Sequence, residues 1–432
     1  MFPVIAIVIT LALIVFLAFK KVNIVLISVV AAALLAVMDG QNIISALTGS
    51  FMTGASNYVK NFFLLFCISA LFGKVMEKTG AAAAIAKWLA NLLGEKYAIL
   101  GVLFAGMLLT YGGISALVIA FTMYPLTLAV FKRANLPRYL IPGTIAAGCF
   151  TFAAAAFPGT PQTINIIPTT YLGTDVMAAP VLGIICGIIG TVLICVYMYW
   201  ESSRARAKGL GFEADAATLE TLKKADDMGD GINPFVALLP IIVIIVLLVV
   251  VKANVLLAML AGTVLCALLF YKNVKDISGM FESAIASGTS AAITTGCIVG
   301  YGSVVSASTG YAILSEALTN MAAPPLVSFG IATTILAGAA GSGTGGLGIT
   351  MTSMAPQYLA MGLDPEVLHR VGTMAAIGLD SSPHCGAVVV LLTLAGMTHK
   401  DSYKQIFVTT VVITLIIAAI AIALGTIMYP IG

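Results

Sequence analysis

Four short polar motifs interrupt an otherwise apolar sequence, and each of them contains glycine or proline. They are Thr110-Tyr-Gly-Gly-Ile-Ser115, Pro158-Gly-Thr-Pro-Gln-Thr-Ile-Asn165, Gly341-Ser-Gly-Thr-Gly-Gly346 and Asp380-Ser-Ser-Pro-His-Cys-Gly386. Glycine and proline break helices, and a helix that restarts after a break offers unpaired N–H groups and partial positive charge at its N-terminus. Together with Ser and Thr hydroxyls, such N-termini suit a carboxylate. The motifs therefore predict a binding site for a small anion.

No Lys or Arg lies within the four motifs. We therefore expect backbone and hydroxyl donors to hold the anion, which still permits its release. Close helix packing is the other common role of membrane glycines, and we expect it for Gly73 and Gly106. The interleaved Ser and Thr favour a binding role at 341–346. The predicted substrate-contacting residues are Tyr111, Gly112, Gly113, Ser115, Gly159, Thr160, Gln162, Thr163, Asn165, Ser342, Gly343, Thr344, Gly345, Ser381 and Ser382.

Asp380 and His384 are the residues in these motifs that can change charge near neutral pH. An ionisable group inside a membrane is costly and is by default a functional candidate. Their i, i+4 spacing predicts a pair that carries a co-transported proton. The alternatives are that Asp380 caps a helix restarting at Pro383 and that His384 is a hydrogen-bonded packing residue.

Three further basic residues lie near the predicted membrane edges. We expect His369 and His399 to be surface residues. We expect Arg370 to extend its side chain to the interface rather than to bind an anion.

The composition fixes the class of protein that holds these motifs. Of 432 residues, 60% are hydrophobic and 9% are charged, whereas a soluble domain has about 25% charged residues. The chain is therefore expected to be a polytopic α-helical protein of the cytoplasmic (inner) membrane. The net charge of +3 gives no reason to expect a nucleic-acid partner. The seven cysteines stand singly, so we predict no metal site and no disulfide. Catalytic and nucleotide-binding motifs are absent, so we predict neither an enzyme nor a cofactor.

Apolar runs between polar breaks predict the spans. They cover 3–19, 22–38, 57–77, 97–131, 139–163, 176–200, 235–251, 254–271, 289–308, 326–361, 366–397 and 406–430. The runs 97–131 and 326–361 exceed the roughly 20 residues of one crossing and contain glycine breaks, so we interpret both as re-entrant hairpins. With both termini outside, 18 of the 21 Lys and Arg residues fall on the cytoplasmic side, as the positive-inside rule requires.

The two halves of the chain resemble each other. Five short segments recur in the same order, 222–231 residues apart: 73–80 with 302–310, 123–125 with 354–356, 135–137 with 363–365, 142–147 with 371–376, and 157–161 with 379–383. The topology places the two hairpins on opposite sides, so the repeats are predicted to be inverted. We predict a first repeat at 1–200 (hairpin 97–131, broken span 139–163), a cytoplasmic linker at 201–234, and a second repeat at 235–432 (hairpin 326–361, broken span 366–397). A short amphipathic segment is expected in each repeat, at 81–93 and 311–322. Inverted repeats with broken helices are typical of secondary transporters.

At these residues the sequence resembles the gluconate:proton symporter (gluconate permease) family of the ion-transporter superfamily. The similarity is clearest in GSGTG at 341–345, MGLDP at 361–365 and GMT at 396–398, and in FPGTP at 157–161 of the first half. The resemblance implies proton-coupled uptake of small organic acids, such as sugar acids or hydroxy-carboxylates. It also implies a homodimer whose transport domains move in an elevator manner.

The sequence therefore predicts a symporter that imports a small carboxylate with protons. Two alternative transport functions remain open. One is sodium-coupled carboxylate symport, with Na⁺ held by carbonyls and by hydroxyls at the hairpin tips and the first break. The other is a cation/proton antiporter that uses Asp380 and carries no organic substrate.

Overall fold

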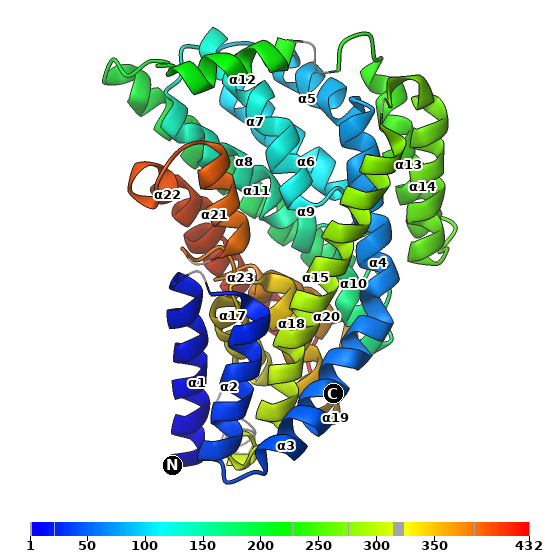
Figure 1. Cartoon of the computed structure of the whole chain (residues 1–432), viewed down its shortest axis with the longest axis vertical. Helices are drawn as coiled ribbons and strands as arrows, with labels where there is room; N and C mark the ends of the chain where they lie inside the picture. The colour runs from blue at the N-terminus through cyan, green and yellow to red at the C-terminus, as the bar shows by residue number, and fades with distance from the viewer. Residues whose placement is uncertain are drawn as a thin grey trace.

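The computed structural model describes residues 2–20, 22–226, 229–274, 276–313, 324–383 and 385–431, and they are almost entirely helical (Figure 1). The amphipathic segment expected at 311–322 falls mostly outside these residues. The helices of the first half are α1 Phe2–Phe19, α2 Ile24–Met38, α3 Ile43–Ser45, the π-helix η1 Ala46–Phe51, α4 Met52–Lys78, α5 Ala81–Leu92, α6 Ala98–Tyr111, α7 Ala116–Arg133, the 3₁₀-helix η2 Arg138–Leu140, α8 Ile141–Cys149, α9 Phe152–Ala155, α10 Thr163–Leu172 and α11 Pro180–Ala207.

The second half follows a charged connection that contains α12 Ala216–Asp226. Its helices are α13 Pro234–Val249, α14 Val255–Leu269, the 3₁₀-helix η3 Tyr271–Asn273, α15 Ile277–Ser306, α17 Pro325–Ala340, α18 Gly343–Ser353, α19 Ala355–Ala360, α20 Pro365–Ala376, α21 Gly386–Leu394, α22 His399–Phe407, the π-helix η4 Val408–Val412 and α23 Ile413–Met428. Both termini lie at the lower end of the molecule in Figure 1, and α12 lies at the opposite end.

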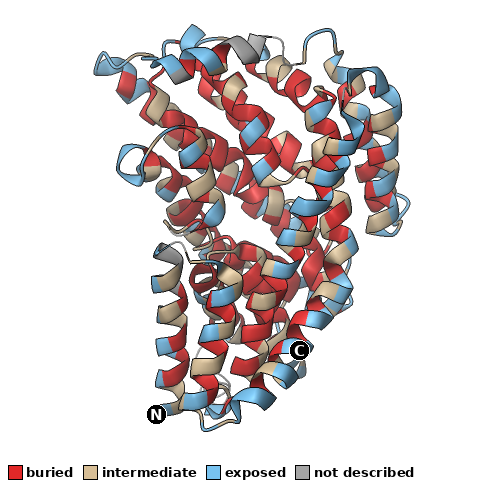
Figure 2. Cartoon of the chain, viewed as in Figure 1, coloured by how far each residue is buried: buried red, intermediate tan, exposed pale blue. Residues whose placement is uncertain are grey.

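Several helices have the length and composition of membrane spans. In the described residues, five continuous helices qualify: Ile43–Lys78, Ala116–Arg133, Pro180–Ala207, Ile277–Ser306 and His399–Met428. Shorter apolar helices, including α2, α6, α13, α14 and α17, accompany them. Buried residues fill the centre of the bundle and exposed ones lie outside (Figure 2). The outward residues are largely apolar; on α11 they include Ile184, Ile188 and Val192, which recur at helical spacing and present an apolar face to lipid.

Three helices extend beyond their predicted apolar runs. The helix that contains α4 begins at Ile43 rather than at residue 57, and α15 begins at Ile277 rather than at 289. In both cases polar residues near the start end the apolar run without ending the helix. The third, α11, continues to Ala207, and within this extension Glu201 is buried and pairs with Lys404 (3.4 Å) and Arg204 (3.7 Å).

The two predicted hairpins and broken spans correspond to pairs of helices. Residues 97–131 form α6 and α7 around a turn at 112–115, and residues 326–361 contain α17 and α18 around a turn at Gly341 and Ser342. The first break separates α9 from α10, so this helical segment ends at Leu172 rather than at 163. The second break separates α20 from α21.

The long helices α4 and α15 pack side by side along most of their length (Figure 1). A Cβ on Gly288 would lie 2.7 Å from the Cα of Cys67, and one on Gly300 would lie 2.8 Å from the carbonyl oxygen of Phe51. These glycines therefore allow the two backbones to approach. The pair α1–α2 packs on α15, whereas α14 of the pair α13–α14 packs on α4. Each half of the chain thus contributes a helix pair that covers the long helix of the other half.

Glycines also set the crossing of α6 and α8. A Cβ on Gly106 of α6 would lie 3.3 Å from the Cα of Gly148 of α8. Between α4 and α7, a Cβ on Gly73 would lie 3.3 Å from a methyl group of Val118. The packing role expected for Gly73 and Gly106 is confirmed by these contacts.

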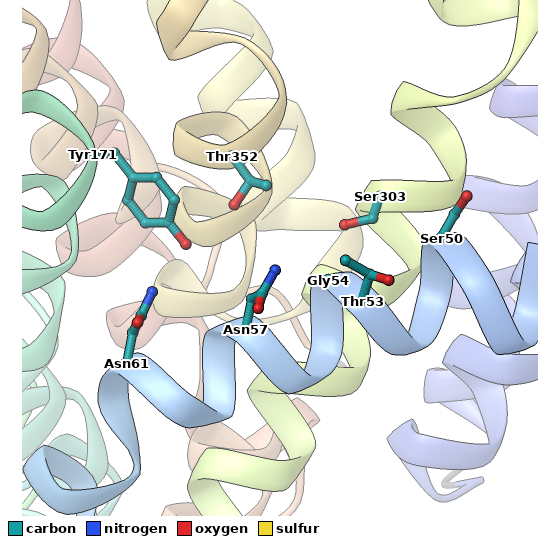
Figure 3. Close-up of a pocket in the computed structure, with 8 residues that line it drawn as sticks. All are labelled: Ser50, Thr53, Gly54, Asn57, Asn61, Tyr171, Ser303 and Thr352. Carbon is teal, nitrogen blue, oxygen red and sulfur yellow. The ribbon is translucent and has the colours of Figure 1, made fainter.

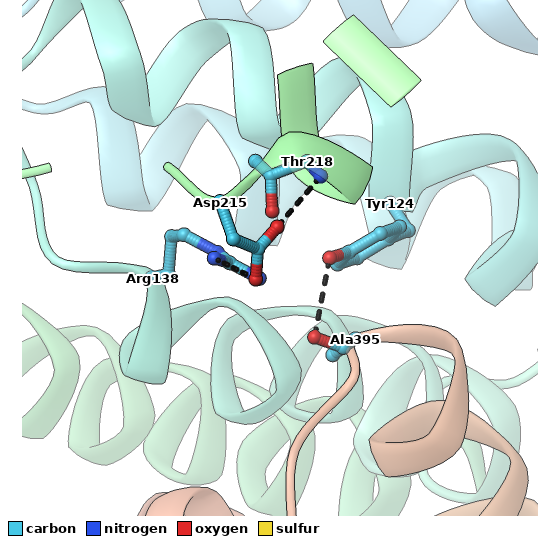
Figure 4. A network of polar contacts seen from close by, with 5 residues as sticks. All are labelled: Tyr124, Arg138, Asp215, Thr218 and Ala395. Atoms are coloured by element: carbon cyan, nitrogen blue, oxygen red, sulfur yellow. Dashed lines mark hydrogen bonds and ion pairs between the residues drawn. The ribbon is translucent and has the colours of Figure 1, made fainter. Parts of the chain in front are cut away.

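The connection between the halves, predicted as a linker at 201–234, packs against the helical bundle. α12 packs on α7, and Arg138 pairs with Asp215 at 3.1 Å (Figure 4). Asp215 also accepts the N–H of Thr218 (2.8 Å), while the Tyr124 hydroxyl donates to the carbonyl of Ala395 (3.3 Å). Hydrogen bonds from Thr218, followed by that from Arg138, lower the pKa of Asp215 to about 2. The carboxylate is therefore charged at neutral pH, and its contribution to docking is lost only as the pH falls from about 4 toward 2.

The positive-inside rule predicts which side of the membrane each segment faces, and the fold shows where reporter cysteines can be placed to test it. Thr218 is buried, so a reporter cysteine is better placed at Ala214, which is exposed in the connection, and at Gly49, which is exposed and has nothing within 4 Å of its Cβ position. A membrane-impermeant thiol reagent applied to intact cells is expected to label Gly49→Cys but not Ala214→Cys, and the reverse is expected in inverted vesicles. Labelling of both from one side would contradict the predicted orientation.

Candidate functional site

The turn of the first hairpin is docked on the first helix break. The Tyr111 hydroxyl donates to the carbonyl of Pro158 at 2.8 Å, and the Thr160 hydroxyl donates to the carbonyl of Tyr111 at 3.3 Å. The Gln162 amide donates to the carbonyls of Thr110 (2.6 Å) and Ile114 (3.0 Å). These hydrogen bonds join the turn that follows α6 to the break that follows α9, so the turn and the break form one unit.

Two glycines in this unit adopt backbone angles that other residues avoid. Gly113 has φ +92° and Gly159 has φ +85°, both in the left-handed region that glycine tolerates. A Cβ on Gly113 would lie 2.8 Å from the Pro161 ring, and one on Gly112 would lie 2.8 Å from Ile241. These glycines therefore set the shape of the turn, and the N–H groups of Gly112, Gly113 and Gly159 bond to backbone carbonyls within the protein.

The second hairpin turn presents the N-terminus of α18. Gly341 ends α17 with φ +59°, and Ser342 caps α18 by accepting the N–H of Gly345 at 3.2 Å. The Ser342 and Thr344 hydroxyls lie 3.2 Å apart. Two hydroxyls and the first N–H groups of α18 thus converge at this turn.

Asp380 from the second break lies against the same N-terminus. Its Oδ2 lies 2.8 Å from the Cβ position of Gly343, and its Oδ1 accepts the Ser381 hydroxyl at 2.9 Å. The hydroxyl of Ser382 donates to the carbonyl of Leu379 at 2.7 Å. Because α21 restarts at Gly386 with Cys385 as its N-cap, Asp380 does not cap it, and the capping alternative is wrong.

The two units meet at the start of α10. The Ile164 side chain lies 3.1 Å from the Cβ position of Gly343, and α10 packs on both α18 and α20. The N-termini of α10 and α18 are therefore neighbours, with half-buried Thr163 on one and half-buried Ser342 and Thr344 near the other. Ser115 begins α7 at the first turn, and its side chain makes no capping bond. Two adjacent helix N-termini with hydroxyls can bind an anion.

Arg370 of α20 binds the backbone of the first half from a fully buried position. Its Nε donates to the carbonyl of Ala178, and its terminal nitrogens donate to the carbonyls of Ala155, Val176 and Ala178 and to Asn165 Oδ1, over 2.8–3.3 Å. All five N–H groups of the guanidinium are thereby paired. The expectation that Arg370 reaches the interface is wrong, because the side chain is 0% exposed. It is also unable to donate to a substrate without first losing one of these bonds.

His369 and Asn165 complete this contact, which we call the Arg370 clasp. His369 Nε2 lies 3.1 Å from Asn165 Oδ1, and its Nδ1 lies 2.8 Å from the Thr174 hydroxyl. Asn165 Nδ2 donates to the carbonyls of Thr160 and Val176, both at 3.0 Å. Burial of His369 (0% exposed) contradicts its expected surface position, whereas His399 is exposed as expected. Buried loop carbonyls need donors, which accounts for these polar residues in the interior.

The predicted contact residues thus occupy different roles. Ser342, Gly343, Thr344, Gly345, Asp380 and Ser381 come together at the second turn, whereas Tyr111, Gly159, Thr160 and Gln162 hold the first. Asn165 has its donors and acceptor engaged by protein groups. His384 lies outside the described residues. The sequence motifs did not predict the clasp. The one sequence feature that indicated it is an Arg next to a His within a predicted broken span.

The clasp predicts a large difference between two cation substitutions. Arg370→Met leaves several buried carbonyls without a donor, at about 1–3 kcal/mol for each unpaired group. Lys252→Met is the control, since Lys252 is exposed and its ion pair with Asp175 spans 3.7 Å, a type worth about 0–1 kcal/mol. We expect the detergent-solubilised Arg370→Met protein to melt well below wild type and Lys252→Met to melt close to it. Equal melting temperatures for Arg370→Met and wild type would contradict a structural role for the clasp.

Comparisons with known proteins place this arrangement in a wider group. The sequence model of the family described as GntP family permease matches residues 2–253 of this chain. An uncharacterized transporter of Bacillus subtilis (strain 168), YxjC, is 34% identical over 96% of this chain and 97% of its own length. An uncharacterized transporter of Haemophilus influenzae is 23% identical over 78% of each chain.

The fold is also similar to a solved structure. The crystal structure of the Alcanivorax borkumensis YdaH transporter, described as having an unusual topology, aligns with a TM-score of 0.57. The alignment covers 87% of each chain at 15% sequence identity, which relates the two folds. The family match and the similarity to YxjC show that this chain belongs to the GntP permease family and is a multi-pass membrane transporter, not an enzyme.

Proposed function

We propose that the protein is a secondary active transporter that imports a small organic acid, a sugar acid or hydroxy-carboxylate, together with protons. The observation that carries the proposal is the meeting of the α10 and α18 N-termini beside Asp380. The N-termini and their hydroxyls would hold the substrate carboxylate. Asp380 would carry the proton.

Charge favours an anion over a cation at this place. In the described residues no carboxylate forms an ion pair with Arg370, and its hydrogen bonds go to neutral oxygens. Glu366 and Asp175 act on the guanidinium from a distance, so the clasp leaves a partly compensated positive charge behind the first break. Because interactions between charges are weakly screened in a protein interior, that charge would attract an anion without touching it.

Proton coupling follows from the same electrostatics. A substrate carboxylate at the α18 N-terminus would repel a charged Asp380, and protonation of Asp380 would remove that repulsion. Binding of the anion and binding of the proton would thus favour each other. His384 remains proposed as a partner in proton transfer.

We further propose that the two halves are inverted repeats and that the site moves in an elevator manner within a homodimer. The crossed packing of α1–α2 on α15 and of α14 on α4 supports this arrangement. Sodium coupling and cation/proton antiport are the alternatives that the experiments below separate.

The hydroxyls at the second turn provide a test of substrate binding. Ser342→Ala and Thr344→Ala should each weaken apparent affinity by about fivefold, from about 1 kcal/mol per lost hydrogen bond. Thr393→Ala is the matched control, because this exposed hydroxyl only bonds within its own helix. The measurement is uptake of labelled D-gluconate and other small hydroxy acids into proteoliposomes at equal protein content. Unchanged affinity in both variants would place the substrate elsewhere.

Asp380→Asn provides the test of coupling. The amide keeps the shape of the side chain but cannot take up the proton, so uptake driven by a pH gradient should be abolished. Exchange of internal for external substrate needs no net proton movement and should survive. His384→Gln should flatten the dependence of uptake between about pH 5 and 8, where histidine titrates.

The alternatives give other outcomes in the same vesicles. Full pH-driven uptake by the Asp380→Asn, His384→Gln double variant would exclude both residues from coupling. Uptake that follows an imposed sodium gradient would favour sodium symport. Proton flux driven by cations, without uptake of any organic acid, would favour the antiporter.

A further inference from the structure

A polar cavity lies apart from the hairpin turns, at the far end of α18. Its volume is about 540 Å³, within the range of about 300–1,000 Å³ typical of small-molecule sites. One wall is a face of α4 that carries Thr53, Asn57 and Asn61 at four-residue intervals (Figure 3). None of these residues was singled out by the sequence motifs.

This face of α4 is polar although α4 belongs to a membrane-length helix. All three residues are exposed in the bundle. A carboxamide facing lipid without a partner would cost several kcal/mol, so the face must meet water or a polar ligand. The adjacent face of α4 is apolar and buried by contrast, with Tyr58 and Phe62 at 0% and 2% exposed. The polar side chains, with the exposed Lys60 among them, therefore mark a wet face of this helix, on which the cavity lies.

Hydroxyl groups from three other helices form the opposite side. Tyr171 ends α10, Ser303 lies near the end of α15, and Thr352 lies near the end of α18 (Figure 3). The side chains of Tyr171 and Thr352 are hydrogen-bonded to each other. A Cβ on Gly54 would overlap Ser303, so glycine at this position lets α15 approach α4 across the cavity floor. The cavity is thus shared by helices from both halves of the chain.

The chemistry of the lining specifies a class of ligand. The residues around the cavity offer hydroxyls and carboxamides, and none of them is charged. Hydroxyls and amides both donate and accept hydrogen bonds, as do the hydroxyls of a polyol. None of the lining residues offers a cation to a carboxylate; the exposed Lys60 lies beside Asn61 on α4 but is not among them. We propose that the cavity is a second, outer binding site for the hydroxylated carbon chain of the solute, which rests on the proposed function.

The position of the cavity suits an intermediate binding site on the path of the solute to the hairpin turns. Thr352 lies nine residues after Gly343 on α18, about 14 Å at 1.5 Å per residue. With both termini outside, as the charge distribution predicts, the segments that meet here all lie toward the outer side. A solute would first be held here by its hydroxyls and would then pass to the N-termini that hold its carboxylate.

Protection of a cysteine in the cavity tests this site without any transport. Thr53→Cys is made in the full chain after Cys195 and Cys297, which are partly exposed, are replaced by Ala; the other five cysteines are buried. The purified protein in nanodiscs is labelled with a charged thiol reagent in the presence of D-gluconate, D-sorbitol or succinate. The first two carry several hydroxyls, whereas succinate carries charge alone.

We expect gluconate and sorbitol to slow the labelling and succinate to have no effect. At ten times the half-protecting concentration the rate should fall by roughly tenfold. Asn57→Ala and Asn61→Ala should each raise the half-protecting concentration by about fivefold. Asn91→Ala, a change of the same type at an exposed position of α5, should leave it unchanged. Labelling of Gly49→Cys, a reporter outside the cavity, should proceed at the same rate with or without the polyhydroxylated compounds.

Three outcomes of the protection experiment would overturn the proposal, and a fourth comes from the Ser342→Ala variant. They are equal protection by succinate, an absence of protection by either polyhydroxylated compound, and protection that is indifferent to both Asn57 and Asn61. Ser342→Ala separates this site from the one at the hairpin turns. If that variant loses affinity for uptake while protection persists, two sites exist; if it abolishes protection, the effect comes from the hairpin site and the outer site is excluded. A failure of proton coupling at Asp380 would leave the protection result unaffected.

Discussion

The need to pair backbone polar groups at membrane depth constrains every part of this structure. Helix breaks expose N–H and C=O groups where lipid offers no partner, and the chain meets that need with side chains. Gln162 serves the first turn, Arg370 and Asn165 serve the loops around α10, and the Tyr403 hydroxyl donates to the carbonyl of Ser381 at 3.0 Å in the second break. At the N-terminus of α18 the N–H of Gly345 already donates to Ser342 and that of Gly343 to Asp380, so the proposed anion would use the remaining N–H groups and the nearby hydroxyls.

Arg370 has the largest structural consequence among these side chains. Its five hydrogen bonds run from α20 in the second half to carbonyls and an amide in the first. The broken helices of the two halves are therefore fixed to each other, and the N-termini of α10 and α18 are held as neighbours. A buried guanidinium bound to neutral oxygens also keeps its charge, so one residue supplies both rigidity and a positive potential.

Glycine residues complement these polar side chains. Where they let two helix backbones approach closely, space is left for polar groups elsewhere. The contacts of Gly288 and Gly300 bring α15 against α4, and Gly54 brings Ser303 to the cavity on the same helix pair. Gly113, Gly159 and Gly341 adopt left-handed angles in the turns and breaks. Tight packing and irregular backbone thus come from the same residue type in two different positions.

The sequence by itself determined the class of protein, the apolar helices, the positions of the two turns and two breaks, and the family. The family came from the resemblance of short motifs; the other features follow from composition and from local signals, since apolar length and glycine or proline act over a few residues. Only the tertiary structure decided the roles of Arg370, His369 and Asn165, because the hydrogen bonds that join the two halves through these residues connect positions 192–215 apart along the chain. It also decided that Asp380 faces α18 rather than capping α21. The polar face of α4 was hidden for a related reason: Asn57 and Asn61 lie inside the predicted apolar run 57–77 and Thr53 lies just before it, and only the helices packed opposite them form a cavity with these residues.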